Sequence, residues 1–395
     1  MPPVPVRSRI RSLELPPFDP LNRRAAELRA SGHPVISLGQ AVPFFPPPDA
    51  AIAAAREALG GPEVHRYVTD PGLPALRAIL AERLASTIGA AIASDDVVIT
   101  AGGNHAFTLA LATLVDAGDE VVLPATYFTN HQMAVVAAGA DAIEAPVADR
   151  ATFAVRWSDV EPHLTARTKA VVLCNPSNPT GAPVDASDGR LIVERLSSRG
   201  VFVISDDTYM QFVYDGAHWS AASVPAWRRN VVFVGTFSKA FGMMGWRVGF
   251  FLADAAICEQ AVKVQDAMII CAPAISQMAA AAAVREAWSY PLSFHDELRR
   301  RRAVLADGLA AIPRLHWTPT RGGLFAFARV DGCGDSAALS ADLLERAHIV
   351  TIPGAAFGRS GEGFLRLSYG YATADELAEA AGRLRRFFAA GSWSG

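Results

Sequence analysis

Short apolar runs rich in β-branched residues alternate with longer amphipathic segments over the first three quarters of the chain. The apolar runs are residues 97–100, 120–123, 170–174, 201–205, 231–234 and 248–252. Between most of them lie segments of helical length, and in one segment Leu76, Ile79, Leu80 and Leu84 form an apolar stripe at helical period. Apolar strands alternating with helices are typical of a mostly parallel sheet covered on both faces. We therefore predict an α/β fold.

The pattern changes after about residue 290. A charged helix over 294–312 is followed by a strand over 323–330, a helix near 340–348 and a strand over 363–369. This order predicts a smaller α+β domain. The expected division is an N-terminal arm and strap joining the small domain (1–48), a large domain (49–289) and a small C-terminal domain (290–395).

Composition narrows the class of protein. The chain is 51% hydrophobic and 19% charged, with a net charge of −3, and it contains no block of like charge. These values do not indicate a positively charged surface that would bind nucleic acid. The longest apolar stretches are too short to span a bilayer. The beginning lacks the apolar core of a secretory signal, and the four cysteines show no paired spacing, so we expect a cytoplasmic protein with free thiols. The nine histidines show no metal-binding spacing, so we expect no metal site.

The predicted strands end in chemically distinctive segments. These segments are 100–104, 175–181, 206–209 and 236–239. Ligands of parallel sheets bind beyond the carboxyl ends of the strands. We therefore expect one site at one edge of the large sheet.

Lysine is scarce in this sequence, with three lysines against 33 arginines. An amine can lose its proton and attack a carbonyl, whereas a guanidinium stays protonated. We interpret Lys169 and Lys263 as surface residues. Lys239 lies at a strand end, in the segment Gly-Thr-Phe-Ser-Lys-Ala-Phe-Gly-Met-Met-Gly-Trp-Arg-Val-Gly. It is the candidate nucleophile.

Other strand-end residues allow two interpretations. The turn containing Gly102, Gly103 and Asn104 either cradles an anion at a helix N-terminus or is an ordinary strand-to-helix turn. Arg247 is either the partner of a phosphate or a surface arginine. Asp206 is either a helix N-cap or a carboxylate that holds a proton on a heterocyclic nitrogen.

The same ambiguity applies to two further candidates. Asn178 and Tyr209 are two donors that could reach a phenolate oxygen. Alternatively, Asn178 is a turn residue and Tyr209 is an aromatic residue of the core.

Lys239 and its flanks resemble the cofactor-binding motif of the class I/II pyridoxal-phosphate-dependent aminotransferases. The resemblance continues in order along the chain, through Tyr67-x-x-x-x-Gly-x-x-x-Leu-Arg, the glycine turn at 102–104, Asn-Pro-x-Asn-Pro-Thr-Gly at 175–181, Asp206-x-x-Tyr209 and Phe-Leu-Arg-Leu-Ser at 364–368. It covers nearly everything from about residue 30 onwards. It implies fold type I, pyridoxal 5'-phosphate and a homodimer with shared sites.

The resemblance also implies roles for single residues. Lys239 binds the cofactor as an aldimine and shuttles a proton, Asp206 keeps the pyridine nitrogen protonated, and Asn178 and Tyr209 bind the ring hydroxyl. The phosphate is cradled by Gly102, Gly103, Asn104, Thr236 and Arg247, and Tyr67 reaches the phosphate of a neighbouring subunit. Tyr127 stacks on the ring, while Arg366 and the backbone of Ala41, together with Asn178, meet the substrate.

The sequence departs from relatives in the strap over 38–45, where Ala41 replaces a glycine and Phe44 an aspartate. Because this strap is apolar, we expect a neutral, apolar or aromatic L-amino acid as donor to a 2-oxo acid, in a ping-pong reaction. Packing of Val42, Phe44 and Phe45 between the domains is the alternative. A pyridoxal-phosphate-dependent lyase, cyclase or oxidase and a non-catalytic sensor are the competing functions.

Overall fold

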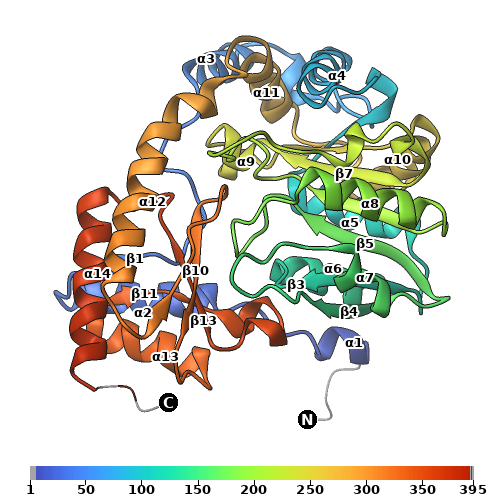
Figure 1. Cartoon of the computed structure of the whole chain (residues 1–395). Coiled ribbons are helices and arrows are strands. Elements are labelled where there is room, and N and C mark those ends of the chain that lie inside the picture. Colours follow the sequence, from blue (N-terminus) through green and yellow to red (C-terminus); the bar gives the residue numbers. More distant parts are fainter. Residues whose placement is uncertain (1–5, 392, 394–395) are drawn as a thin grey trace.

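The computed structural model describes residues 6–391 and 393, which form two main β-sheets with their own helices (Figure 1). Residues 1–5 of the expected N-terminal arm lie outside this described part. Within it, no helix is long and apolar enough to cross a membrane. The four cysteines are free, as the sequence predicts.

The larger sheet has seven strands in the order β2-β8-β7-β6-β5-β3-β4. Their bounds are β2 Val97–Thr100, β3 Glu120–Ala125, β4 Asp141–Pro146, β5 Thr168–Cys174, β6 Phe202–Asp206, β7 Val231–Thr236 and β8 Gly249–Leu252. All neighbouring strands are parallel except that β8 runs antiparallel to both β2 and β7. The mostly parallel sheet predicted from the apolar runs is confirmed.

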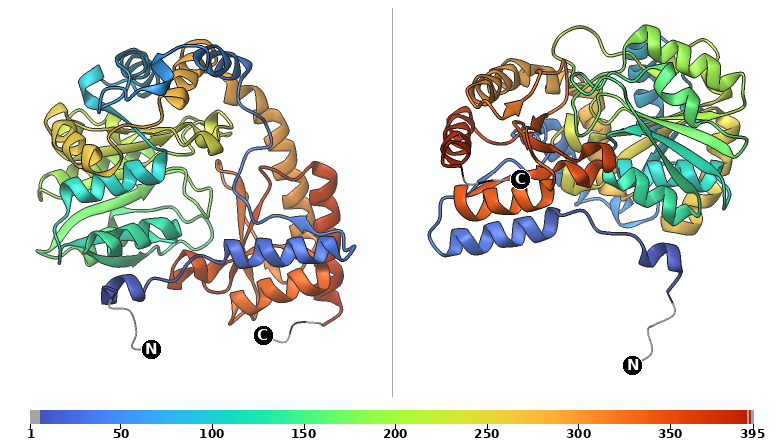
Figure 2. Two further views of the ribbon diagram at one scale, coloured as in Figure 1. Left: turned by 180° about the vertical axis from the view of Figure 1, so that it is seen from behind. Right: turned by 60° about the horizontal axis from the view of Figure 1, so that its bottom comes forward.

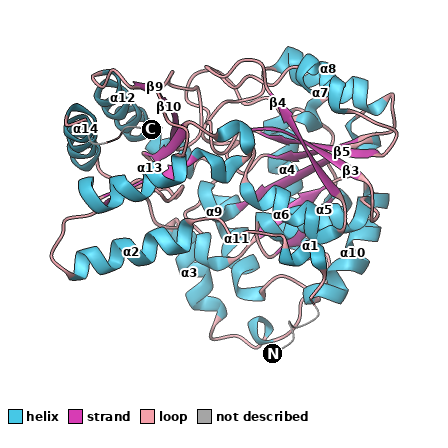
Figure 3. Cartoon of the chain, turned by 90° about the horizontal axis from the view of Figure 1, so that it is seen from below, coloured by secondary structure: helices cyan, strands magenta, loops and turns pink. Residues whose placement is uncertain are grey.

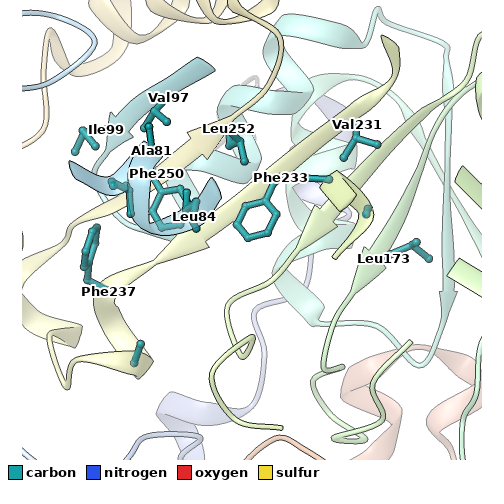
Figure 4. Packing of buried hydrophobic residues seen from close by; sticks show 14 of the residues in the cluster. Ala81, Leu84, Val97, Ile99, Leu173, Val231, Phe233, Phe237, Phe250 and Leu252 are labelled. Atoms are coloured by element: carbon teal, nitrogen blue, oxygen red, sulfur yellow. The ribbon is translucent and has the colours of Figure 1, made fainter. Parts of the chain in front are cut away.

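Helices cover both faces of this sheet because alternate strand residues point to opposite sides. Val97 and Ile99 belong to the core cluster shared with α3 (Asp49–Ala58), α4 (Pro74–Ile88), α8 (Ala186–Ser197) and α11 (Ala274–Glu286). The short α7 (Trp157–Val160) also lies there, and Phe233 and Phe250 fill the layer between sheet and helices (Figure 4). Val98 faces the other side, towards α5 (Gly103–Leu114), α6 (Thr129–Ala138) and α10 (Ala255–Ile269).

The smaller sheet is antiparallel, in the order β12-β13-β10-β9. Its strands are β9 Leu315–His316, β10 Phe325–Val330, β12 Ile352–Pro353 and β13 Phe364–Ser368. Helices α12 (His295–Ala310) and α14 (Ala374–Ala389) share one apolar core with it. The change from one sheet to the other falls between α11 and α12, near the boundary expected at residue 290. The domain division itself stays a prediction.

The N-terminal segment touches both halves of the molecule. Helix α1 (Ser8–Arg11) lies against α6, whereas α2 (Phe18–Ala30) lies beside α13 (Ser336–Asp342), next to the small sheet (Figures 2 and 3). After α2, strand β1 (Ile36–Ser37) pairs in parallel with β11 (Ile349–Val350). The strap that follows β1 is thereby fixed against the small sheet.

Two details differ from the sequence predictions. Strand β4 was not predicted, because its sequence Asp-Ala-Ile-Glu-Ala-Pro has one β-branched residue and it is an edge strand with little burial. The helix expected near 340–348 begins earlier, at Ser336, where the Asp335 carboxylate accepts a hydrogen bond from Ala338 N at 2.9 Å. The helix then continues as a π-helical turn over Leu343–Ala347.

Candidate active site

A cavity of about 360 Å³ lies at the carboxyl ends of β5, β6 and β7. The strap after β1, helix α2 and strand β13 close it from the side of the small sheet. All the predicted site residues line this cavity except Gly102, Tyr67 and Tyr127. Those that line it are Ala41, Gly103, Asn104, Asn178, Asp206, Tyr209, Thr236, Lys239, Arg247 and Arg366.

Lys239 is held on the short helix α9 (Phe237–Ala240), which begins directly after β7. The Thr236 hydroxyl caps this helix by accepting a hydrogen bond from Ser238 N at 3.1 Å. Burial lowers the pKa of Lys239 to about 8, and the positive charges of Arg366 and Arg247 act in the same direction. The site therefore increases the fraction of the neutral, nucleophilic amine.

This pKa predicts a measurable pH profile. A lysine with a pKa of about 8 is roughly one tenth neutral at pH 7, whereas the ordinary pKa of about 10.4 leaves less than about one thousandth neutral. Protonation removes the nucleophile, so the reactivity of Lys239 should fall as the pH drops below 8. In the cofactor-free protein, we expect acetic anhydride labelling of Lys239, followed by mass spectrometry, to reach half its maximum near pH 8. After unfolding in urea the midpoint should move to about 10.4; identical midpoints would contradict the prediction.

Asp206, the last residue of β6, forms a buried pair with His131. Its Oδ2 lies 2.9 Å from His131 Nε2, and its Oδ1 accepts a hydrogen bond from Thr208 N at 3.0 Å. Burial alone would raise the pKa of Asp206, but these bonds and the attraction to His131 hold it below its usual value. The N-cap alternative is excluded, since β6 is followed by a turn and not by a helix. A persistent carboxylate therefore faces the cavity.

Arg366 comes from β13 and is buried, with 1% of its surface exposed. Its Nη1 donates to Asn178 Oδ1 at 2.9 Å and its Nη2 to the carbonyl oxygen of Gly39 at 2.6 Å. Its buried Nε has no hydrogen-bond partner among the described residues. The rings of Phe325 and Phe357 lie 5.3 and 5.0 Å from the guanidinium carbon.

Burial lowers the pKa of Arg366 to about 10, so the guanidinium stays charged at neutral pH. A buried cation in aromatic surroundings, with one N–H unpaired, is built to receive an anion. Burial also raises the pKa of Tyr209, so its phenol stays protonated and can donate a hydrogen bond.

The opposite end of the cavity offers donors suited to a larger anion. Gly103 is the first residue of α5, and Thr236, Ser238 and Arg247 line the same region. Gly102 has a φ of +86°, and a side chain there would overlap the Arg247 guanidinium, so this close approach requires glycine. Together with the helix N-terminus, these groups form a phosphate-sized cradle.

The structure corrects the placement of Tyr127. Its hydroxyl donates to Glu144 Oε2 at 3.4 Å and its N–H to the carbonyl oxygen of Phe357 at 3.2 Å, so it belongs to the contact between the two halves of the chain. Phe128 lines the cavity in its place. The family resemblance, from which Tyr127 was chosen, did not distinguish two adjacent aromatic residues.

Three further expectations have different outcomes. Residues 39–42 of the strap line the cavity, as expected for Ala41. Phe44 and Phe45 do not line it: Phe45 stacks on Phe294 at 4.1 Å, which supports the alternative of packing between the domains. Tyr67 is 78% exposed, and its contact with a neighbouring subunit stays a prediction.

Sequence reasoning missed several residues of the cavity wall. They are Phe18 and Asn22 of α2, Gln40, Phe107, Phe128, His131, Cys174, Thr208, Ser238 and Met244. Cys174 could have been found, because it is the last residue of β5 and its Cα is paired with that of Asp206. The helices α2 and α6 carry no strand-end signal, so nothing in the sequence marked Asn22 or His131.

One cavity at the edge of the mostly parallel sheet thus brings together a lysine of lowered pKa, a buried carboxylate–imidazole pair, an anion cradle and a buried arginine. This combination is the site of the aminotransferase class. Residues 33–384 match the family described as aminotransferase class I and II. The chain belongs to this family, whose members depend on pyridoxal phosphate, and it is an aminotransferase.

Individual relatives are similar in sequence or structure to almost the whole chain. The aspartate aminotransferase of Pyrococcus abyssi is 32% identical over 92% of this chain and 94% of its own length. The aromatic-amino-acid aminotransferase 2 of Thermococcus litoralis is 31% identical over the same shares. The crystal structure of the Thermotoga maritima aspartate aminotransferase has a TM-score of 0.91 at 28% identity, covering 97% of this chain and all of that one. The relatives differ in the substrates that their names give.

Proposed function

We propose that this aminotransferase binds pyridoxal 5'-phosphate at Lys239 and moves an amino group from a neutral, apolar or aromatic L-amino acid to a 2-oxo acid by a ping-pong mechanism. One observation carries the proposal: Lys239, the Asp206–His131 pair and Arg366 face the same cavity although they come from four separate segments. We further propose that the protein is a cytoplasmic homodimer, in which the exposed Tyr67 of each subunit reaches the site of the other.

The residues present fit this cofactor. The cradle of Gly103, Asn104, Thr236 and Arg247 supplies the donors that a phosphate requires, and Gly102 leaves room for the guanidinium beneath it. His105 adds no charge, because burial lowers the pKa of its imidazole. The aromatic wall for the pyridine ring is Phe128.

Each remaining group has a task that its surroundings permit. Asp206, kept ionised by His131, would hold a proton on the ring nitrogen. Tyr209, kept protonated by burial, would donate to the ring hydroxyl, and Asn178 could do so through its NH2 because its Oδ1 already accepts a hydrogen bond from Arg366. When bound, the cofactor supplies an electron sink for the negative charge that develops at the substrate Cα.

Lys239 and Arg366 act on the substrate itself. Arg366 binds the substrate carboxylate in a paired, charge-assisted contact. In the first half-reaction the neutral amine of Lys239 would remove the proton from the Cα of the amino donor, and in the second it would deliver a proton to the Cα of the new amino acid. The carboxylate contact fixes which bond of Cα faces Lys239.

The preference for a neutral donor rests on the charges of the cavity wall. Among the described residues that line it, the cations are Lys239, Arg247 and Arg366, each of which has a task above. No further lysine or arginine of these residues stands opposite a second substrate carboxylate. Ala41, Val42 and Phe18 make the adjoining wall apolar. Of the three strap residues on which the preference was first based, Val42 lines the cavity, whereas Phe44 and Phe45 do not.

The test is a comparison of amino donors. Because a second carboxylate lacks a partner, we expect kcat/KM with L-phenylalanine, L-tyrosine and L-methionine to exceed that with L-aspartate and L-glutamate by about tenfold or more. The holoenzyme is supplied with 2-oxoglutarate or pyruvate as acceptor, and both the new 2-oxo acid and the new amino acid are quantified. Faster turnover of aspartate would contradict the preference. Unequal amounts of the two products would instead indicate a lyase, cyclase or oxidase reaction.

A further inference from the structure

Within the proposed function, on which this inference rests, we propose that Asn22 is a specificity-determining residue. It recognises a neutral hydrogen-bonding group at the end of the donor side chain, such as a phenol or a carboxamide. The preferred donors are thereby narrowed from apolar or aromatic amino acids to neutral amino acids with a polar tip.

The position of α2 gives Asn22 access to the substrate. Phe18 and Asn22 are four residues apart, so they lie one above the other on the same face, and both line the cavity. Ala25 and Leu28 of the same helix are buried in a cluster with Leu344 and Val350 beside the small sheet. The helix therefore presents one face to the small sheet and another to the cavity.

A surface ion pair supports this orientation. Arg24 donates from Nε to Glu345 Oε1 at 2.6 Å and from Nη2 to Glu345 Oε2 at 2.8 Å. Because both side chains are exposed, this contact contributes little energy, and the rotation of α2 about its axis is set mainly by the buried cluster of Ala25, Leu28, Leu344 and Val350.

The distance between Asn22 and the carboxylate site at Arg366 suits an amino-acid side chain. The ring of Phe18 lies 5.5 Å from the guanidinium carbon of Arg366, so a carboxylate bound to Arg366 lies beside Phe18. Asn22 is one helical turn, about 5.4 Å, further along α2. Asn22 is therefore within reach of the side chain of a substrate held by its carboxylate at Arg366.

The chemistry of Asn22 selects a neutral polar group. Its half-buried carboxamide has no hydrogen bond to any residue in the described part of the chain, and Ala41 and Val42 of the adjoining wall offer apolar side chains. A carboxamide both donates and accepts, so it pairs with a phenol or with another amide. A charged tip would find no opposite charge nearby, whereas a wholly apolar tip would leave the carboxamide unpaired.

Two pairs of ligands test this assignment. The first pair, 3-(4-hydroxyphenyl)propanoate and 3-phenylpropanoate, carries the carboxylate but no amino group, so its binding to the holoenzyme can be measured by calorimetry without turnover. The second pair is L-tyrosine and L-phenylalanine, compared by kcat/KM. In the wild-type protein we expect about a tenfold preference for the hydroxylated member of each pair.

Three variants complete the test. Asn22→Leu, of similar size, and Asn22→Ala, which suits a helix, should lose most of the preference while changing the values for the unhydroxylated ligands less than about threefold. Asn130→Leu is the matched control, because Asn130 is half-buried on α6 but does not line the cavity, and it should retain the preference.

The outcomes separate this inference from the proposed function. Amino transfer with equal preference in the wild-type protein and in both Asn22 variants would overturn the role of Asn22, and so would equal losses for both members of a pair. If neither propanoate binds measurably, the ratio of kcat/KM values decides in the same way. Selective binding of the hydroxylated acid without amino transfer to any acceptor would support the role of Asn22 and contradict the proposed function.

Discussion

Replacing Lys239 with alanine should reduce amino transfer by about 10⁴-fold or more, because one substitution removes both the covalent attachment of the cofactor and the base that moves the Cα proton. A guanidinium at the same place would not replace it, since it does not lose its proton at neutral pH. Lys239→Arg should therefore be nearly as inactive as Lys239→Ala. Single-turnover rates should be measured with a saturating amino donor, so that the loss of rate is not mixed with a change in the affinity for the donor.

The scarcity of lysine makes the control simple. Lys263 lies on the surface, where its Nζ donates to Gln260 at 2.8 Å, and Lys263→Ala should retain wild-type rates. Borohydride treatment of the holoenzyme should attach the cofactor to the peptide containing Lys239 in the wild-type protein and in Lys263→Ala. Attachment to another lysine, or substantial turnover by Lys239→Ala, would show that the nucleophile has been assigned wrongly.

Asp206→Asn should be the second most damaging change, with a loss of about 10²- to 10⁴-fold in the single-turnover rate. The amide has nearly the shape of the carboxylate but no charge, so it cannot keep a proton on the ring nitrogen. It also leaves His131 opposite a neutral group at 2.9 Å. Because Arg366 and the phosphate cradle are untouched, the KM for the donor should change far less than kcat.

The neighbouring residue provides the matched control. Asp207 is buried more deeply than Asp206 and pairs with His218 at 3.0 Å and with the Ser205 hydroxyl at 2.6 Å, but it does not line the cavity. Asp207→Asn should lower the melting temperature with little effect on the single-turnover rate. If both variants lose the same fraction of activity, the contribution of Asp206 is structural.

Most of the large sheet could be predicted, because its buried strands consist of continuous apolar residues. Strand β4 could not, since an edge strand is stabilised by pairing with β3 and needs no apolar composition of its own. The antiparallel direction of β8 was equally hidden. Apolar periodicity indicates that a segment is a strand but does not give its direction in the sheet.

The site was predictable where its residues end strands or belong to motifs, as Lys239 and Asp206 do. His131 was not, because its partner Asp206 is 75 residues away and a lone histidine on a helix has no local signal. Whether Tyr127 or Phe128 faces the cavity depends on the conformation of the loop that carries both residues. That conformation is fixed by contacts with Phe357 and Glu144, which are distant in sequence.

Those contacts have a mechanical consequence. Besides Tyr127, the carboxylate of Glu144 accepts hydrogen bonds from the N–H groups of Arg359 and Ser360, at 3.0 and 2.8 Å. The loop that carries Phe128 is thus tied to the segment between β12 and β13, and β13 carries Arg366. A hinge motion of the small sheet must either break these bonds or take Phe128 with it. A motion that keeps these bonds moves Phe128 and Arg366 together, which would make substrate entry and alignment of the reacting atoms parts of a single movement.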